Sequence, residues 1–180
     1  MVIVGLDTSL THTGIVIIND KGKVLDSGVI KSKPNGDTYL SEVERIVKIV
    51  EDVFSKITKN CKKKPDLVVI ENLAFMARNT TSLVQLSGLS FFIRIQLARF
   101  EIPFVMVAPT SLKKFITGSG KGDKDMLMMS VYKNYGFEAV DNNENDAFGL
   151  SAIGLALLGK PIKKLGVPQQ EVVNLLKKQL

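Results

Sequence analysis

Three acidic residues stand at positions where they could act together as metal ligands. Asp7 closes an apolar run that begins the sequence, Glu71 follows the apolar run 67–70, and Asp146 lies near the start of a long apolar segment. Carboxylate oxygens without His or Cys partners are ligands that suit Mg²⁺ or Mn²⁺. These residue types therefore make an oxygen-rich cation site the first hypothesis for the chemistry of this chain.

The segments around Asp7 and Glu71 predict that the two carboxylates lie side by side. Each acid ends a strand-like run, and a right-handed crossover through a helix over residues 38–60 would make the two strands parallel neighbours. The acids would then share the carboxyl edge of the sheet, about 4.8 Å apart, where ligands of open α/β sheets bind. Two carboxylates at that separation repel each other unless a cation or a proton joins them.

Asp146 would join this edge from the first turn of a helix predicted over about residues 143–158. Residues three apart share a helix face, so Asn143 and Asp146 would point the same way, with Asp141 and Glu144 close by. The rest of this helix is apolar and must pack on protein, which leaves the acids of its first turn free to project toward the strand ends.

Each acid also has a purely structural interpretation. Asp7 could accept hydrogen bonds within the turn 8–11, and Asp146 could offset the helix dipole. Glu71 is harder to explain in this way, because an acid directly after a buried apolar strand is costly unless it is paired. Taken together, the three positions favour a shared site over three independent structural roles.

A cluster of three acids that holds two metal ions is suited to hydrolysing a phosphodiester. One ion lowers the pKa of a bound water, and the other stabilises the departing oxygen. The sequence has a net charge of +6 and a pI of about 9.4, which favours a polyanionic partner. Charge and acid placement therefore indicate nucleic acid as the substrate.

The composition argues against several other classes of protein. There is no run of 18 apolar residues to cross a membrane, and the first residues lack a basic leader and a cleavage site. The single Cys61 can form neither an internal disulfide nor a thiolate metal site. We therefore expect a cytoplasmic protein with no membrane partner.

Periodicity gives the elements that must position the acids. Strands are predicted over 1–7, 13–19 and 24–30, close enough in sequence to form an antiparallel meander. A helix over about 38–60, capped by Asp37 or Thr38, follows. The residues expected to face inward from it are Leu40, Val43, Val47, Val50, Phe54 and Ile57.

The second half of the chain continues the alternation of strands and helices. After the buried strand 67–71, a long helix over about 79–100 and a strand over 102–107 are predicted. The residues expected to face inward from this helix are Leu83, Leu86, Leu89, Ile93, Leu97 and Phe100. The remaining predicted elements are a short helix at 110–117, a loop at 118–122, helices at 123–135 and 143–158, a basic linker at 160–166 and a terminal helix opened by Pro168.

This order predicts an α/β fold. We expect one mixed five-stranded sheet, with its first three strands antiparallel and helices on both faces. Residues 1–158 would form one domain, and residues 159–180 a basic linker with a short terminal helix. No internal repeat is evident.

Four ordered motifs resemble those of the RuvC-type Holliday-junction resolvases, which are endonucleases of the ribonuclease-H-like superfamily, including phage-type members. The first is residues 4–14, with Asp7 after a strand and Gly14 at the next strand; the second is Ile70-Glu71 followed by residues 75–79. The third runs from Ala108-Pro109 to residues 123–124, and the fourth covers residues 145–150. Together they span about residues 2–158.

The resemblance implies a ribonuclease-H-like fold and a magnesium-dependent endonuclease that cuts Holliday junctions and other branched DNA. It implies that Asp7, Glu71 and Asp146, with Asn143, hold two Mg²⁺ ions per site, for which Mn²⁺ would substitute. Lys113 and Lys124 would orient the scissile backbone and count with the acids as catalytic. The residues expected to contact DNA are Phe75, Arg78, Lys113, Lys114, Lys121 and Lys124.

The resemblance further implies a homodimer with two active sites, acting in a bacterial or phage-infected cell. The helix after Glu71 would contribute to the dimer, where Ser87, Gly88 and Ser90 would permit close approach. Ordinary core packing is the other explanation for this helix.

Asn143 departs from the family pattern, which usually places a second acid at this position. Its amide oxygen can touch a metal ion but carries no charge, so the metal affinity should be weaker. Asp141 or Glu144 could substitute for it, or the chain could be an inactivated variant. These alternatives remain open from the sequence.

Three other functions compete with this interpretation. One is a broader branched-DNA or RNA–DNA nuclease, and another is a non-catalytic junction-binding protein. The third is a sugar-kinase-like or actin-like ATPase, which needs two such domains, whereas 180 residues hold only one. The loop 118–122 is not a Walker motif, so no nucleotide cofactor is expected.

Overall fold

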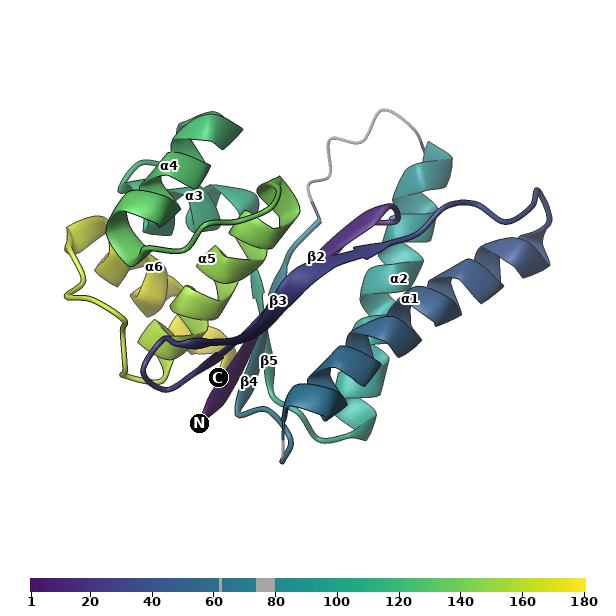
Figure 1. Ribbon diagram of the computed structural model, residues 1–180, viewed down its shortest axis with the longest axis horizontal. Helices are drawn as coiled ribbons and strands as arrows, with labels where there is room; N and C mark the ends of the chain where they lie inside the picture. Colours follow the sequence, from purple (N-terminus) through teal and green to yellow (C-terminus); the bar gives the residue numbers. More distant parts are fainter. Residues whose placement is uncertain (62, 74–79) are drawn as a thin grey trace.

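The computed structural model describes residues 1–61, 63–73 and 80–180. Within these residues one five-stranded sheet has the order β3-β2-β1-β4-β5. Its strands are β1 (Val2–Asp7), β2 (His12–Asn19), β3 (Val24–Lys31), β4 (Leu67–Glu71) and β5 (Phe104–Val107). Figure 1 shows the sheet between two groups of helices, which confirms the predicted mixed sheet with helices on both faces.

The strand pairing agrees with the predicted topology. β1 pairs antiparallel with β2, and β2 pairs antiparallel with β3, so the first three strands form the expected meander. β4 pairs parallel with both β1 and β5. Alternate residues of β4 enter opposite cores, with Leu67 and Val69 on one face and Val68 and Ile70 on the other. This double burial explains why the strand is apolar at consecutive positions.

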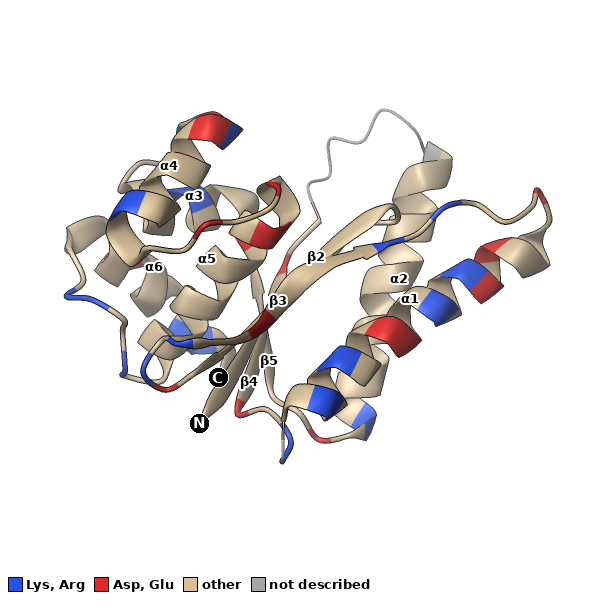
Figure 2. Ribbon diagram, in the orientation of Figure 1, with Lys and Arg blue, Asp and Glu red and all other residues tan. Residues whose placement is uncertain are grey.

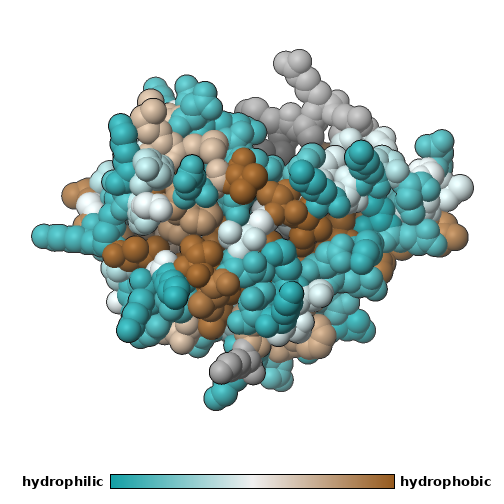
Figure 3. All heavy atoms as spheres, in the orientation of Figure 1, coloured by the Kyte–Doolittle hydropathy of each residue, from teal (hydrophilic) through white to brown (hydrophobic). Residues whose placement is uncertain are grey.

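One face is covered by α1 (Tyr39–Asn60) and α2 (Thr80–Arg99). Thr38 is the N-cap of α1, because its side chain accepts from the Ser41 amide, while Ser41 Oγ accepts from the Thr38 amide. Hydrophilic side chains cover the outward face of α1 (Figure 3), as an amphipathic helix requires.

The inward face predicted for α1 is partly wrong. Val50 and Ile57 are buried, but Leu40 and Val43 are 67% and 56% exposed. Figure 1 shows the reason, since the first turns of α1 extend beyond the strands and have no sheet beneath them. Ile49 and Val53, which the prediction omitted, complete the buried face.

α2 buries a narrower stripe than the sequence predicted. Leu89, Ile93 and Leu97 are fully buried, whereas Phe100 is exposed. Ser90 also lies in the core, which confirms core packing for that position. On the outward side, Val84, Phe91 and Ile95 are 68%, 58% and 49% exposed. We name these three residues the α2 stripe.

The other face is covered by α3 (Pro109–Thr117), α4 (Lys124–Tyr135), α5 (Asn142–Leu157) and α6 (Val167–Leu176), followed by the 3₁₀ turn η1 (Lys177–Gln179). α5 lies directly on β1, β2 and β4 and is buried along almost its whole length. The segment after residue 158 packs into this same core through Val172, Val173 and Leu176 of α6. In the described part of the chain, no helix is long and apolar enough to span a membrane.

Candidate active site

Asp7 and Glu71 lie side by side at the carboxyl edge of the sheet, as predicted. The parallel ladder of β1 and β4 pairs Leu6 with Ile70, so the next residue of each strand is one of the two acids. Asp7 is 8% exposed and Glu71 is partly buried. Their carboxyl groups are close enough to affect each other's ionisation, and a hydrogen bond between them requires a proton on one of the two.

Burial and mutual repulsion disfavour the ionised forms of these acids. The pKa of Asp7 is raised to about 9, first by burial, then by the negative charge of Glu71, its hydrogen bond and the charge of Asp146. The pKa of Glu71 is raised to about 7, first by burial, while the hydrogen bond from Asp7 opposes the rise. The protein therefore holds a carboxyl pair that a proton or a cation must neutralise.

Asp146 is close enough for its charge to act on both members of this pair. Burial is the main reason that its own pKa is raised. Its place follows from glycines that let α5 touch the sheet backbone. A Cβ on Gly5 would stand 1.9 Å from the carbonyl oxygen of Ala147, and one on Gly14 would stand 2.0 Å from that of Asn143.

Two lysines lie close enough for their charges to act on the acids. The positive charge of Lys124 lowers the pKa of all three acids, and that of Lys113 lowers the pKa of Glu71 and Asp146. Lys113 Nζ donates to the Gly122 carbonyl oxygen at 3.3 Å, which links α3 to the loop before α4. Figure 2 shows basic residues on α3 and α4 near the acidic start of α5. The site thus combines buried negative charge with cations at its rim.

The donor set fits a divalent cation in its chemistry. Three carboxylates approach one another, none is neutralised by an ion pair in the described residues, and burial favours removal of their charge. Within residues 1–61, 63–73 and 80–180, however, no three His, Cys, Asp or Glu side chains converge closely enough to hold one ion as they stand. Asp7 and Glu71 form the closest part of the site, and Asp146 would have to turn toward them to share an ion.

The neighbouring acids at the start of α5 accept hydrogen bonds from backbone amides. Asp141 is the N-cap, and its Oδ1 accepts from the amides of Asn143 and Glu144 at 2.9 and 3.0 Å. Glu144 is 2% exposed and accepts from the Val140 amide at 2.6 Å. Neither carboxylate is therefore placed to substitute for the charge that Asn143 lacks. The Asn143 amide group donates to Asp141 Oδ2 at 3.4 Å.

The remaining predicted DNA contacts lie in different surroundings. Lys114 forms an ion pair with Glu171 and so points toward α6. Lys121 is exposed in the loop between α3 and α4, where its amide donates to Ser119 Oγ. Phe75 and Arg78 lie outside the described residues.

Arg45 is a neighbour of the site that sequence reasoning missed. Its guanidinium donates through Nη2 to the Leu10 carbonyl oxygen and through Nε to Ser32 Oγ at 3.0 Å. It therefore ties α1 to the turn that follows Asp7 and to the segment after β3. Arg45 has no motif around it, so nothing in the sequence connects it to residues 10 and 32.

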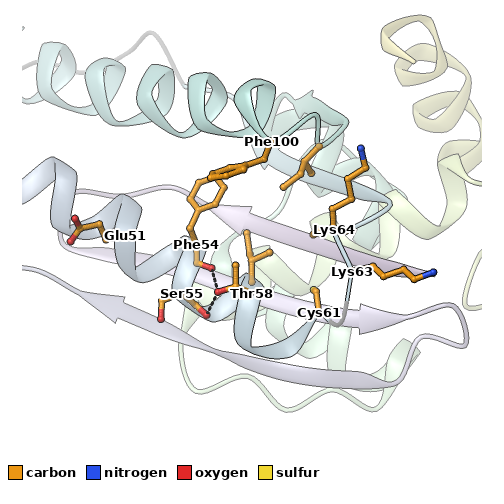
Figure 4. Close-up of a pocket in the computed structure, with 11 residues that line it drawn as sticks. Glu51, Phe54, Ser55, Thr58, Cys61, Lys63, Lys64 and Phe100 are labelled. Carbon is orange, nitrogen blue, oxygen red and sulfur yellow. Dashed lines mark hydrogen bonds between the residues drawn. The ribbon is translucent and has the colours of Figure 1, made fainter.

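A mainly apolar pocket lies elsewhere, between the carboxyl-terminal ends of α1 and α2. It encloses about 690 Å³ and is walled by Phe54 and Phe100, whose ring centroids are 5.6 Å apart (Figure 4). Glu51 is the one carboxylate among its lining residues. The pocket therefore lacks the acid cluster that metal chemistry needs.

Comparisons with known proteins agree with this picture. A sequence profile of the family described as crossover junction endodeoxyribonuclease RuvC matches residues 3–154. The crossover junction endodeoxyribonuclease RuvC of a strain of Prochlorococcus marinus is 33% identical over 164 residues, covering 88% of this chain and 97% of that protein. That of a strain of Synechococcus is 31% identical over 163 residues, with the same coverage of 88% and 97%.

Solved structures show the same fold. Thermus thermophilus RuvC matches with a TM-score of 0.68 at 20% identity, covering 89% of this chain and 98% of that one. The same protein in complex with a Holliday junction substrate also gives 0.68 at 20% identity, with coverage of 89% and 97%. The yeast mitochondrial Holliday junction resolvase gives 0.58 at 11% identity, with coverage of 99% and 84%. These matches confirm the predicted ribonuclease-H-like fold.

Proposed function

Since this chain belongs to the RuvC family of crossover junction endodeoxyribonucleases, we propose that its acid cluster hydrolyses phosphodiesters in Holliday junctions and other branched DNA. The observation that carries this assignment is the adjacency of Asp7 and Glu71, with Asp146 and Lys124 in electrostatic range of both. A buried pair of acids near a lysine suits hydrolysis of the negatively charged DNA backbone, because the acids can hold metal ions and the lysine can attract the phosphate.

Membership of the family brings dependence on a divalent metal ion. We propose Mg²⁺, with Mn²⁺ as a substitute, and two ions per site. Asp7, Glu71 and Asp146 would be the ligands, and the Asn143 amide oxygen would supplement them without adding charge. Bound ions would supply an activated water and stabilise the departing oxygen.

The lysines would act on the substrate backbone. Lys113 and Lys124 lie beside the acids, where their ammonium groups would hold the scissile phosphate against the repulsion of the carboxylates. Lys121 would contact the backbone next to it from the exposed loop. Phe75 and Arg78 would contact DNA, as the family resemblance implies, whereas Lys114 would first have to break its ion pair with Glu171.

We also propose a homodimer built through the α2 stripe. Val84, Phe91 and Ile95 follow one another at helical spacing, and all three are exposed although they are apolar. A second copy of α2 would cover this stripe across a two-fold axis, with Gly88 in its middle allowing close approach. The two sites of the dimer would then face two opposing strands of a symmetric four-way junction. We also propose that the protein acts in the cytoplasm.

A labelled four-way junction tests the proposed activity. The protein should nick two opposing strands at symmetric positions in Mg²⁺ or Mn²⁺ and leave the junction intact in EDTA. Nicks on linear duplex at the same rate would contradict selectivity for branched DNA.

A catalytically weak junction-binding protein is the second candidate. It is favoured by Asn143, because Asp141 and Glu144 are both engaged by backbone amides and neither takes the place of the missing acid. Junction binding without nicks over a wide range of Mg²⁺ and Mn²⁺ concentrations would select this candidate.

A further inference from the structure

The match to the family profile ends at residue 154, so the segment beyond residue 158 lies outside it. It is nevertheless built into the fold. Buried residues of α6 anchor it in the core shared by α3, α4 and α5. Gln169 and Gln179, on either side of these buried residues, bond to the backbone of Phe115 in α3 and of Met106 in β5.

The first contact is made at the β5 edge of the sheet. β5 is the last strand in the sheet order, so among the described strands one side of its backbone has no neighbour. Gln179 takes that place at Met106. Its Oε1 accepts from the Met106 amide at 3.0 Å, and its Nε2 donates to the Met106 carbonyl oxygen at 2.9 Å. One side-chain amide thus reproduces the hydrogen bonds of an adjacent strand residue.

The second contact holds α3 near its carboxyl-terminal end. Gln169 Nε2 donates to the Phe115 carbonyl oxygen at 3.0 Å, and Glu171 forms an ion pair with Lys114. Both partners on α3 lie within two residues of Lys113. Lys113 is close enough for its charge to act on Glu71 and Asp146, and its Nζ donates to the Gly122 carbonyl oxygen at 3.3 Å, while Lys114 pairs with Glu171 of α6.

β5 and α3 form a continuous unit that borders the site. The Asn72 amide, one residue beyond Glu71, donates to the Val107 carbonyl oxygen at 2.8 Å, so the end of β5 is registered against the acid-bearing strand. Only Ala108 separates β5 from Pro109, where α3 begins. A shift of β5 or α3 would therefore move Lys113 relative to Glu71 and Asp146.

We propose that residues 167–179 form a clamp that fixes the β5–α3 unit and thereby positions Lys113. Gln179 holds one end of this unit at Met106, and Gln169 holds the other end at Phe115. Both are positioning residues, because neither side chain touches the acid cluster. The proposal rests on the proposed function, in that Lys113 serves the cleavage reaction.

The test compares the double variant Gln169→Ala/Gln179→Ala with Gln170→Ala in the full chain. Gln170 is a matched control, because it lies on the same helix and its side chain bonds to exposed Asn174. The clamp variant should cleave a four-way junction about tenfold more slowly in single turnover, with unchanged junction affinity. Gln170→Ala should match the unmodified protein.

A double-mutant cycle separates positioning from general loosening. In a Lys113→Ala background the clamp substitutions should cause little further loss, because there is no lysine left to position. The same fold loss in both backgrounds would overturn the proposal. Gln179→Glu keeps the acceptor for the Met106 amide but loses the donor, so its rate should lie between those of Gln179→Ala and the unmodified chain.

A measurement that does not use cleavage judges the clamp independently. Amide hydrogen exchange at Met106 should accelerate in Gln179→Ala, and amide chemical shifts of residues 113–117 should move in Gln169→Ala, but neither should change in Gln170→Ala. If the unmodified protein does not cut junctions while these changes occur, the clamp stands and the proposed function falls. Unchanged exchange and shifts would overturn the clamp even in an active nuclease.

Discussion

Gly14 lies opposite Asp7 in the β1–β2 ladder, and its missing Cβ is what allows the Asn143 carbonyl oxygen to rest on the sheet. Gly14, the neighbour of Asp7, thus sets the distance between the sheet and α5, the helix that carries Asp146. Gly5, two residues before Asp7, does the same one turn further along α5, against Ala147. The spacing of the acid cluster is therefore fixed by backbone contact between a helix and a sheet.

Substituting either glycine should separate the acids. Gly5→Ala or Gly14→Ala should lower the free energy of unfolding by about 1–3 kcal/mol, because α5 must lift from the strands. Cleavage should fall more than stability alone explains. Urea denaturation and junction cleavage measure the two effects. Gly120→Ala is the control, since a Cβ there meets nothing closer than 3.9 Å; equal behaviour of all three variants would contradict the packing argument.

Neutralising an acid should remove cleavage and preserve DNA binding. Asp7→Asn and Glu71→Gln each delete a proposed metal ligand, and each also relieves repulsion of the phosphate backbone. Both variants should bind a four-way junction as tightly as the unmodified protein or more tightly in gel-shift assays, without nicking it. Glu44→Gln makes the same charge change on the exposed side of α1 and should cut normally. Normal cutting by both acid variants would mean that the metal assignment is wrong.

The raised pKa values predict how the metal-free protein responds to pH. Asp7 ionises near its ordinary pKa of 3.8 in the unfolded chain but only near 9 in the fold, so the folded state binds more protons between these values. Stability must therefore decline as pH rises through this window. In EDTA, we expect Tm to fall steadily as the pH rises from 5 to 9 because of this pair.

Two comparisons isolate the acid pair in that experiment. Asp7→Asn should flatten the decline, since its neutral amide cannot ionise against Glu71. Mg²⁺ should stabilise the unmodified protein more at pH 9 than at pH 5, because protons compete with the ion for the same oxygens. A Tm that rises with pH in the metal-free protein would reverse the expected sign.

Asn143→Asp should raise nuclease activity and lower the Mg²⁺ concentration needed for half-maximal cleavage. The substitution supplies a charge at residue 143, where Asp141 and Glu144 do not replace it because backbone amides engage both carboxylates. Cleavage measured over a series of Mg²⁺ concentrations tests this effect. Unchanged or lower cleavage would count against the placement of residue 143 at the metal site.

Placing a charge in the α2 stripe should break the proposed homodimer. Phe91→Glu puts two like charges near the two-fold axis, so sedimentation should show a monomer at concentrations where the unmodified protein is dimeric. Leu175→Glu is the control, because Leu175 is equally exposed, at 58%, but lies on α6. A dimer that survives Phe91→Glu would move the interface to another surface.

Local patterns were enough to predict the strands, the crossover and the adjacency of Asp7 and Glu71, because each depends on alternation and chain order. They failed at Leu40 and Val43, which have the periodicity of buried residues but lie where α1 runs past the sheet, and at Phe100, which follows the last residue of α2 and packs beside Phe54. The hydrophobic pattern of a helix does not show where the sheet on which it packs ends. The same limit explains why the expected linker and terminal helix could not be connected to α3 and β5.

Contacts between distant polar residues were also beyond the sequence. Arg45 reaches the turn after Asp7, and Gln179 reaches Met106, without any spacing rule that joins them. The roles of Asp141 and Glu144 were left open because an acid near a helix start can bind a metal ion or accept hydrogen bonds from backbone amides. In the structure Asp141 is the N-cap of α5, and Glu144 accepts from the Val140 amide.

Anomalous diffraction from crystals grown with Mn²⁺ tests most directly whether Asp7, Glu71 and Asp146 are metal ligands. The account predicts manganese peaks between the carboxylates of Asp7 and Glu71, with the Asp146 side chain turned toward them. Strong peaks at other sites with none between Asp7 and Glu71 would contradict it.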